Sequence, residues 1–186
     1  EMLGYAVAWS DNTLSERIAR LTSVAAGNTF DQAGVANTFS SALAELGIES
    51  SKMIVKDASG LSKENRVTAN QVAQLLVKIR TDERFVPLIN GFPVSGISGT
   101  LRNRFTETAP DAVGLVKAKT GTLSNTTNLA GYVESGDREY AFVIISDRHA
   151  KTYSVANRIR DLVDRILGKI AAPFLPSVQP EPVPAS

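Results

Sequence analysis

Apolar residues in the first half of the chain recur every three or four positions, which is the spacing of amphipathic α-helices. Thr13 followed by Glu16 has the form of a capping box, so we predict a helix that begins just after Asn12 and ends at Gly27. A second helix is predicted to stop at Gly47. The apolar positions are Leu14, Ile18, Leu21 and Ala25 in the first helix and Val35, Phe39, Leu43 and Leu46 in the second. Each helix is therefore expected to turn one face toward a core.

A third helix and two shorter segments complete the first half of the chain. Thr68 with Gln71 forms a capping box, and the helix that it opens extends to about Ile79. Residues 53–55 are predicted to form a short strand that leads into a turn. The apolar residues that end at Trp9 are interpreted as the interior of a helix, because the run is too short for a secretory leader and no basic region precedes it.

The last third of the chain has the alternating pattern of β-strands. Strands are predicted at 113–122, 129–134 and 139–146. A hairpin joins the last two, and a helix follows whose apolar face holds Val155, Ile159, Leu162 and Ile166. This helix is expected to end at Gly168 and to cover one side of an antiparallel sheet. The pattern predicts one α+β unit over residues 1–172, followed by a proline-rich extended tail at 173–186.

The composition excludes several classes of function. With 43% hydrophobic and 21% charged residues, the chain has the balance of a folded unit with a core, and its net charge of +1 gives no basis for nucleic-acid binding. Cysteine is absent and histidine occurs once, which excludes disulfides, thiol nucleophiles and the usual zinc and iron–sulfur sites. We therefore expect no metal and no cofactor. Any catalysis would use Ser, Thr, Lys, Asp, Glu or the backbone.

Two short motifs carry the candidate chemistry, namely Ser10-Asp11-Asn12 at the mouth of the first predicted helix and Lys119-Thr120-Gly121-Thr122 at the end of a strand. Alternation along that strand places Lys119 on the face opposite Ala118, away from the packed side. Gly121 leaves room for a ligand to approach the backbone. A cation, two hydroxyls and free N–H groups at a strand edge make a carboxylate site, and the Thr122 N–H is available to a developing oxyanion.

Longer stretches of the chain resemble the C-terminal part of the low-molecular-weight class C penicillin-binding proteins, which are serine D-alanyl-D-alanine carboxypeptidases and endopeptidases. These stretches are 8–14, 57–62, 65–68, 94–101, 118–122 and 128–132. The family uses three motifs, which are Ser-x-x-Lys with the nucleophile, Ser-x-Asn and Lys-Thr-Gly. This chain contains the second and the third. None of its eight lysines has a serine or threonine three positions earlier, so the resemblance implies that the nucleophile belongs to an upstream segment or a separate chain.

The resemblance implies both a fold and a mechanism. The fold would be the penicillin-recognising serine transpeptidase and β-lactamase-like fold, incomplete here without its upstream segment. The missing serine would attack the carbonyl between two D-alanines of peptidoglycan and form an acyl-enzyme that water opens. Ser10 would relay the proton toward the departing amine, Asn12 would bind the acyl side of the substrate, and Lys119 would supply positive potential.

The resemblance also implies how the substrate is bound. The hydroxyls of Thr120 and Thr122 would bind the terminal carboxylate, and the Thr122 N–H would form half of the oxyanion hole. Apart from the resemblance, the segment 57–62 is interpreted as a shaped turn rather than a catalytic element, and the alternative is that Lys63, just after it, faces a substrate carboxylate. The implied partners are peptidoglycan stem peptides and, as covalent inhibitors, β-lactams. The implied location is the periplasm or the cell wall after export.

Several alternatives fit the same residues. Ser10-Asp11-Asn12 also suits a plain helix cap, and we assign Asp11 to that structural role. A serine β-lactamase carries the same motifs, but no Glu here has Asn four residues later, as class A deacylation requires. A non-catalytic protein could keep the pocket without the nucleophile. We favour the interpretation in which the chain is one part of a peptidase whose other part lies outside it.

The remaining aromatic and charged residues are assigned structural roles. The core is expected to include Trp9, Tyr132 and Phe142. Arg102 and Arg104 are expected to form ion pairs. His149 lies in a polar segment and is expected to be in solvent.

Overall fold

The computed structural model describes residues 2–172, so the tail expected at 173–186 lies outside the described residues. The helices of the first half are α1 (Met2–Trp9), α2 (Asn12–Ala25), α3 (Gln32–Glu45), α4 (Ala69–Arg80) and α5 (Val86–Ile89). The second half contains β1 (Val116–Leu123), β2 (Thr126–Ser135), β3 (Arg138–Asp147) and α6 (Tyr153–Ala171). Short 3₁₀ helices are η1 (Glu83–Phe85), η2 (Gly99–Leu101) and η3 (Pro110–Ala112). Within residues 2–172, no helix has the length and apolarity needed to cross a membrane.

The three strands form one antiparallel sheet in the order β1-β2-β3. Lys119 in β1 pairs with Ala130 in β2. Ser135 pairs with Arg138, so a two-residue turn joins β2 to β3 and confirms the predicted hairpin. Because β1 is at the edge of this sheet, its outer side is open to segments from elsewhere in the chain.

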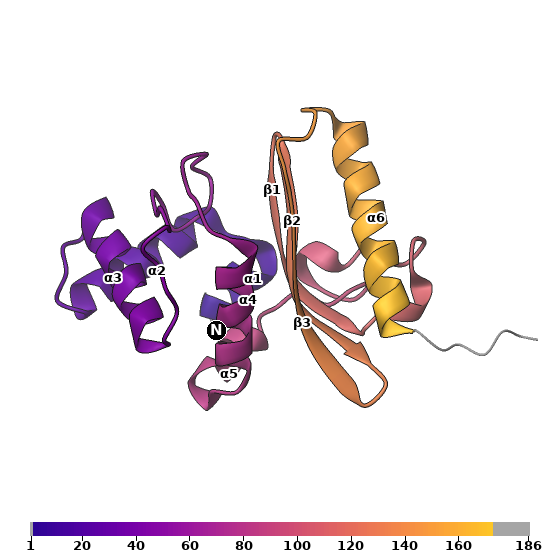
Figure 1. Cartoon of the computed structure of the whole chain (residues 1–186), viewed down its shortest axis with the longest axis horizontal. Coiled ribbons are helices and arrows are strands. Elements are labelled where there is room, and N and C mark those ends of the chain that lie inside the picture. Colours follow the sequence, from indigo (N-terminus) through magenta and orange to yellow (C-terminus); the bar gives the residue numbers. More distant parts are fainter. Residues whose placement is uncertain (1, 173–186) are drawn as a thin grey trace, which may run out of the picture.

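Figure 1 shows the sheet standing between the helices of the first half and α6. On the α6 side, the fully buried residues include Phe105, Val116, Leu129 and Leu167. On the other side, Tyr132 stacks on Phe92 with a centroid distance of 6.0 Å, and its hydroxyl donates to the carbonyl of Leu76 in α4 at 2.8 Å. The apolar packing on both faces fixes the position of β1 between the helical region and α6.

The predicted helices are present, but two of the predicted apolar faces and the start of α2 need correction. Leu21 in α2 is 55% exposed, and in α6 Leu162 and Ile166 are 59% and 44% exposed. The buried face of α6 is one position further along and holds Val163, Leu167 and Ala171.

The predicted capping box is present at α4. At α2 the capping residue is Asp11, whose carboxylate accepts a hydrogen bond from the N–H of Leu14 at 2.8 Å. The predicted box of Thr13 and Glu16 is wrong, because the Glu16 carboxylate accepts instead from N–H groups of the 57–62 turn.

Two strand predictions need correction. Residues 53–55 do not form a strand, because Ile54 makes only an isolated bridge with Arg66. β1 begins at Val116 rather than at residue 113, since η3 and the turn after it occupy the preceding residues. Residues 53–55 and 113–115 both have an apolar pattern that favours a strand in the sequence. Within residues 2–172, neither segment is part of a strand ladder, whereas residues 116–123 pair with β2 along their whole length.

The predicted end of the last helix is also wrong. α6 continues through Gly168 to Ala171. A Cβ at Gly168 would lie 2.7 Å from the Cβ of Ala109. The glycine therefore allows the segment before β1 to pack closely against α6, and it does not end the helix.

Among the residues assigned structural roles, Tyr132 is buried as expected and Phe142 is partly buried against the core. Trp9 is not a core residue, because it is 47% exposed. The guanidinium of Arg102 lies 5.3 Å from the centre of the Trp9 ring rather than in an ion pair. His149 is half-buried, and both of its ring nitrogens have hydrogen-bond partners.

Candidate active site

Ser10 and Lys119 lie 109 residues apart in the sequence and are in direct contact. Lys119 Nζ donates to Ser10 Oγ at 2.7 Å and to the carbonyl of Thr120 at 2.8 Å. An ammonium group has three N–H donors, so one remains for a ligand. Because Ser10 accepts this hydrogen bond, its own hydroxyl proton is free to be donated elsewhere. The fold thus brings one residue of each predicted motif to a single place.

Ser10 stands at a sharp corner between α1 and α2. Its φ of 57° lies in the left-handed region, which residues other than glycine rarely adopt. The corner is held on both sides, because the Asp11 N–H donates to the carbonyl of Ala6 at 3.1 Å and the Asp11 carboxylate caps α2. The two helices therefore maintain a strained backbone that directs the serine hydroxyl toward β1.

Lys119 reaches Ser10 because side chains alternate along β1. Val116 and Ala118 are buried on the α6 side, so Lys119 projects to the opposite face, as predicted. Burial lowers the pKa of Lys119 from its ordinary value of 10.5 to about 8, because the charged form loses hydration. The ammonium group remains mainly protonated at pH 7 and can donate to both of its partners.

Among residues 2–172, backbone contacts cover only the first part of the outer edge of β1. The N–H of Ala118 donates to the carbonyl of Pro93 at 2.9 Å. The direction of the N–H repeats every second residue in a strand, so the N–H groups of Thr120 and Thr122 point to the same edge. They lie beyond the covered part. The strand end therefore presents peptide donors beside Lys119, an arrangement that suits an oxyanion or an extended peptide.

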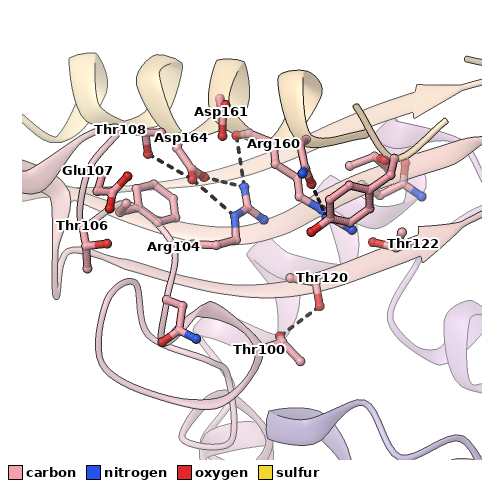
Figure 2. Close-up of a pocket in the computed structure, with 16 residues that line it drawn as sticks. Thr100, Arg104, Thr106, Glu107, Thr108, Thr120, Thr122, Arg160, Asp161 and Asp164 are labelled. Carbon is pink, nitrogen blue, oxygen red and sulfur yellow. Dashed lines mark hydrogen bonds and ion pairs between the residues drawn. The ribbon is translucent and has the colours of Figure 1, made fainter. Parts of the chain in front are cut away.

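The hydroxyl groups of Thr120 and Thr122 lie on the other face of β1 from Lys119. They line a cavity of about 600 Å³ between the strand ends, the segment 100–108 and α6. Thr120 Oγ donates to Thr100 Oγ at 2.9 Å, and Figure 2 shows the two side chains pointing toward one another. The ammonium group and the two hydroxyls are thus on different sides of one strand. A ligand that contacts both must lie along the strand edge.

An ion pair between the half-buried Arg104 and the buried Asp164 forms one wall of this cavity, as Figure 2 shows. Arg104 donates to the Asp164 carboxylate in α6, which also accepts from the Thr108 hydroxyl at 3.2 Å. Burial raises the pKa of Asp164, and the hydrogen bond from Arg104 opposes this shift. The sequence predicts an ion pair for Arg104 but misses its partner. The partner is Asp164, which follows Val163 on the face of α6 that packs on the sheet. An aspartate among buried apolar residues of a helix is the signal that could have identified it.

The other predicted site residues have fewer contacts. Asn12 is the first residue of α2 and is exposed. Gly121 pairs with β2, and a Cβ there would make an ordinary contact at 3.5 Å, so packing within residues 2–172 does not itself require glycine. Lys63 is exposed, and no hydrogen bond or ion pair within those residues joins its ammonium group to Ser10 or Lys119.

The turn that precedes Lys63 is attached to α2. The Glu16 carboxylate accepts from the N–H of Ala58 at 2.8 Å and from the N–H of Ser59 at 2.9 Å. The turn is closed internally by Asp57, which accepts from N–H groups further along it. The sequence did not predict the contact between Glu16 and the turn, because a glutamate near a helix start also fits a capping box. The contact fixes the turn relative to the helix that begins at Asn12.

A helical region with a serine corner thus packs against an antiparallel sheet that carries a lysine on its edge strand. The fold is similar to penicillin binding protein 4 of Haemophilus influenzae, with a TM-score of 0.79 and 26% identity over 89% of this chain and 40% of that one. The model of the D-Ala-D-Ala carboxypeptidase 3 (S13) family matches residues 1–170, and the chain belongs to this family. Both the fold class and the family expected from the sequence are confirmed.

Two relatives agree with this assignment. Carboxypeptidase DacB of Mycolicibacterium smegmatis is 35% identical over 148 residues, which are 77% of this chain and 32% of that protein. The D-alanyl-D-alanine carboxypeptidase of Actinomadura sp. is 39% identical over 114 residues, which are 59% of this chain and 21% of that protein. The chain therefore spans about a third or less of the length of these relatives.

Proposed function

We propose that residues 1–172 are the C-terminal portion of the penicillin-binding domain of a serine DD-peptidase, which acts on D-Ala-D-Ala ends or cross-links of peptidoglycan. The main support is the hydrogen bond between Lys119 and Ser10, which joins the Ser-x-Asn and Lys-Thr-Gly motifs at one site. Relatives named as D-alanyl-D-alanine carboxypeptidases support the reaction class. The Ser-x-x-Lys nucleophile, absent from these 186 residues, would come from a segment or chain outside them.

In the proposed reaction, the nucleophilic serine attacks the carbonyl carbon between two D-alanines. The C–N bond breaks, and the serine proton reaches the amine of the departing D-alanine through Ser10. Ser10 suits this relay, because it accepts from Lys119 and keeps its own proton to donate. Water then attacks the acyl-enzyme ester, which releases the shortened peptide and returns a proton to the serine.

The proposed binding groups surround the end of β1. Lys119 supplies positive charge, and the hydroxyls of Thr120 and Thr122 bind the terminal carboxylate at the strand edge. The Thr122 N–H stabilises the oxyanion that forms during the attack. Asn12 binds the amide on the acyl side of the substrate. Lys63 is assigned to a second substrate carboxylate, to which its exposed ammonium group is open.

The proposed substrates place the protein outside the cytoplasm, in the periplasm or at the cell wall, where peptidoglycan stem peptides occur. β-Lactams resemble the D-alanyl dipeptide and would acylate the same serine. Similar proteins include a carboxypeptidase and a predatory endopeptidase. The proposal therefore includes both peptide ends and cross-links as substrates.

Labelling of the native protein with a fluorescent penicillin tests this proposal. Each labelled band on a denaturing gel is identified by intact mass. We expect a stable label on a polypeptide that carries Ser-x-x-Lys and contains or co-purifies with this chain. Rapid release of the label with hydrolysed penicillin would identify a β-lactamase instead. No label, under conditions in which a control penicillin-binding protein reacts, would contradict the peptidase and favour a non-catalytic protein with the same pocket.

A further inference from the structure

The hydroxyl of Thr120 has a partner outside β1. It donates to Thr100 Oγ at 2.9 Å, and both side chains line the cavity beneath α6. Figure 2 shows this pair at the wall of the cavity, with Thr122 further along the same strand. Thr100 lies in the stretch 94–101 that resembles the family, but it belongs to none of the three motifs and the sequence does not indicate its partner. The contact depends on the tertiary fold, which joins positions 20 residues apart.

Thr100 is held firmly, because η2 is wedged between α1 and the sheet. Leu101 is buried in the core on the α6 side. Gly99 has a φ of 54°, and a Cβ there would lie 2.5 Å from the carbonyl oxygen of Ala8. Only glycine allows so close an approach with this backbone conformation. η2 therefore contacts the helix that leads to Ser10 and also carries the hydroxyl that meets β1.

A threonine hydroxyl donates one proton and accepts others at the same time. In the structure, the Thr120 proton points to Thr100. When a carboxylate reaches the strand edge, the Thr120 proton can turn to it, and the Thr100 proton can then be donated to Thr120 Oγ. The two hydroxyls become a chain in which one hydrogen bond polarises the next. The charged acceptor then receives a stronger hydrogen bond than an isolated hydroxyl would give.

We infer that Thr100 is a positioning residue, which orients the Thr120 hydroxyl toward the carboxylate of a substrate or a β-lactam. This inference rests on the proposed function, which assigns carboxylate binding to Thr120. It adds a specificity role to a segment that contains none of the family motifs. Because η2 is rigidly placed, it fixes the Thr100 hydroxyl relative to β1. This fixed position is what would favour a ligand with a carboxylate.

The test uses two acyl-D-alanyl thioesters whose leaving groups differ only in carrying a carboxylate or its neutral carboxamide. Thr100→Val, in the full-length native protein, keeps the side-chain shape and removes the hydroxyl. We expect kcat/KM for the carboxylate thioester to fall by about tenfold, because one hydrogen bond in a chain to a charged group is lost. The carboxamide thioester should change by less than about twofold. Thr100→Ser restores the hydroxyl and should recover most of the preference.

Thr106→Val is the matched control, because Thr106 is an exposed threonine on the wall of the same cavity. It should leave the preference for the carboxylate unchanged. Thermal unfolding of every variant is measured first, and Thr100→Ala replaces Thr100→Val where valine impairs folding. Equal losses on both thioesters, or no loss, would overturn the positioning role of Thr100.

Thr120→Val separates this inference from the proposed function. A lower carboxylate preference in Thr120→Val, with an unchanged preference in Thr100→Val, would reject only the inference. An unchanged preference in Thr120→Val would show that Thr120 does not bind the carboxylate, and the proposed function would then fail at that residue. A parallel loss in both variants, with recovery in Thr100→Ser, is the expected result.

Discussion

The two faces of β1 near its end have different surroundings. On one face, Lys119 is desolvated and contacts Ser10, a residue from the helical region. On the other face, Thr120 and Thr122 line a polar cavity closed by α6. The strand alternation therefore separates a charge from two hydroxyls, and the peptide N–H groups lie on the edge between them. A motif of four residues can thus serve several binding functions because its members do not compete for one space.

Removal of the charge should have the largest effect. In the full-length native protein, we expect Lys119→Ala to slow penicillin acylation by on the order of 100- to 1000-fold, as loss of a preorganised electrostatic group at a reacting centre does. The time course of fluorescent labelling measures the rate. Lys117→Ala is a control on the same face, since Lys117 pairs with Glu134 at 2.9 Å. Acylation of Lys119→Ala at the unmutated rate, in a protein with a normal melting curve, would remove Lys119 from the site.

On the cavity face, the largest effect should be on stability. Asp164→Ala leaves the largely buried guanidinium of Arg104 without its carboxylate, and loss of one member of such an ion pair costs about 3 kcal/mol. Urea unfolding measures this difference. Asp161→Ala, an exposed change on the same helix, should have little effect. The double variant of Arg104→Met and Asp164→Leu should recover much of the stability, because both buried charges are removed together. A loss well below about 1 kcal/mol in Asp164→Ala would contradict a buried pair.

A smaller effect on selectivity is expected for Thr122→Ala, which removes a hydroxyl but keeps the backbone N–H. The preference for a carboxylate thioester over its carboxamide analogue should fall by about tenfold, since a hydrogen bond to a charged group is lost. The ratio of the two kcat/KM values measures this preference. Equal losses on both thioesters would assign Thr122 to a general structural role.

The smallest expected effect concerns the pH dependence of stability. The pKa of Lys119 is lowered to about 8, so the folded protein binds this proton more weakly than the unfolded chain. Burial of the charge therefore destabilises the protein at pH 7, and this penalty is relieved as the pH rises from about 8 toward 10.5. Between pH 7 and pH 9, the protein should gain about 1 kcal/mol of unfolding free energy relative to Lys119→Met. Parallel pH profiles in urea unfolding would show that the Lys119 charge is not buried.

Local patterns were sufficient to predict the elements that position the site. Apolar spacing predicted the helices α2, α3 and α6, although not the face of α6 that is buried, and alternation predicted the face of β1 that carries Lys119. The capping box of α4 was also correct, because its two residues bond only within four positions of the chain. These features depend on neighbours in the sequence, which a reader of the sequence can see.

Contacts between distant segments could not be predicted in this way. Glu16 fits a local cap equally well, but in the fold it binds a turn more than 40 residues away. Asp164 sits within an apolar face because Arg104 comes from another segment to neutralise it. Thr100 acquires a partner only when η2 is wedged beside β1. The chemistry at each of these positions is set by packing, and the residue type alone leaves several partners open.

The left-handed backbone of Ser10 has a consequence for protein engineering. A glycine would adopt this φ without strain, whereas a non-glycine residue held in a sparsely populated region costs about 1 kcal/mol or more. A selection for heat resistance alone would therefore favour glycine at this corner, and it would delete the hydroxyl that meets Lys119. Thermostability and the proposed proton relay have opposite requirements at this one position, so attempts to stabilise the fold should leave Ser10 unchanged.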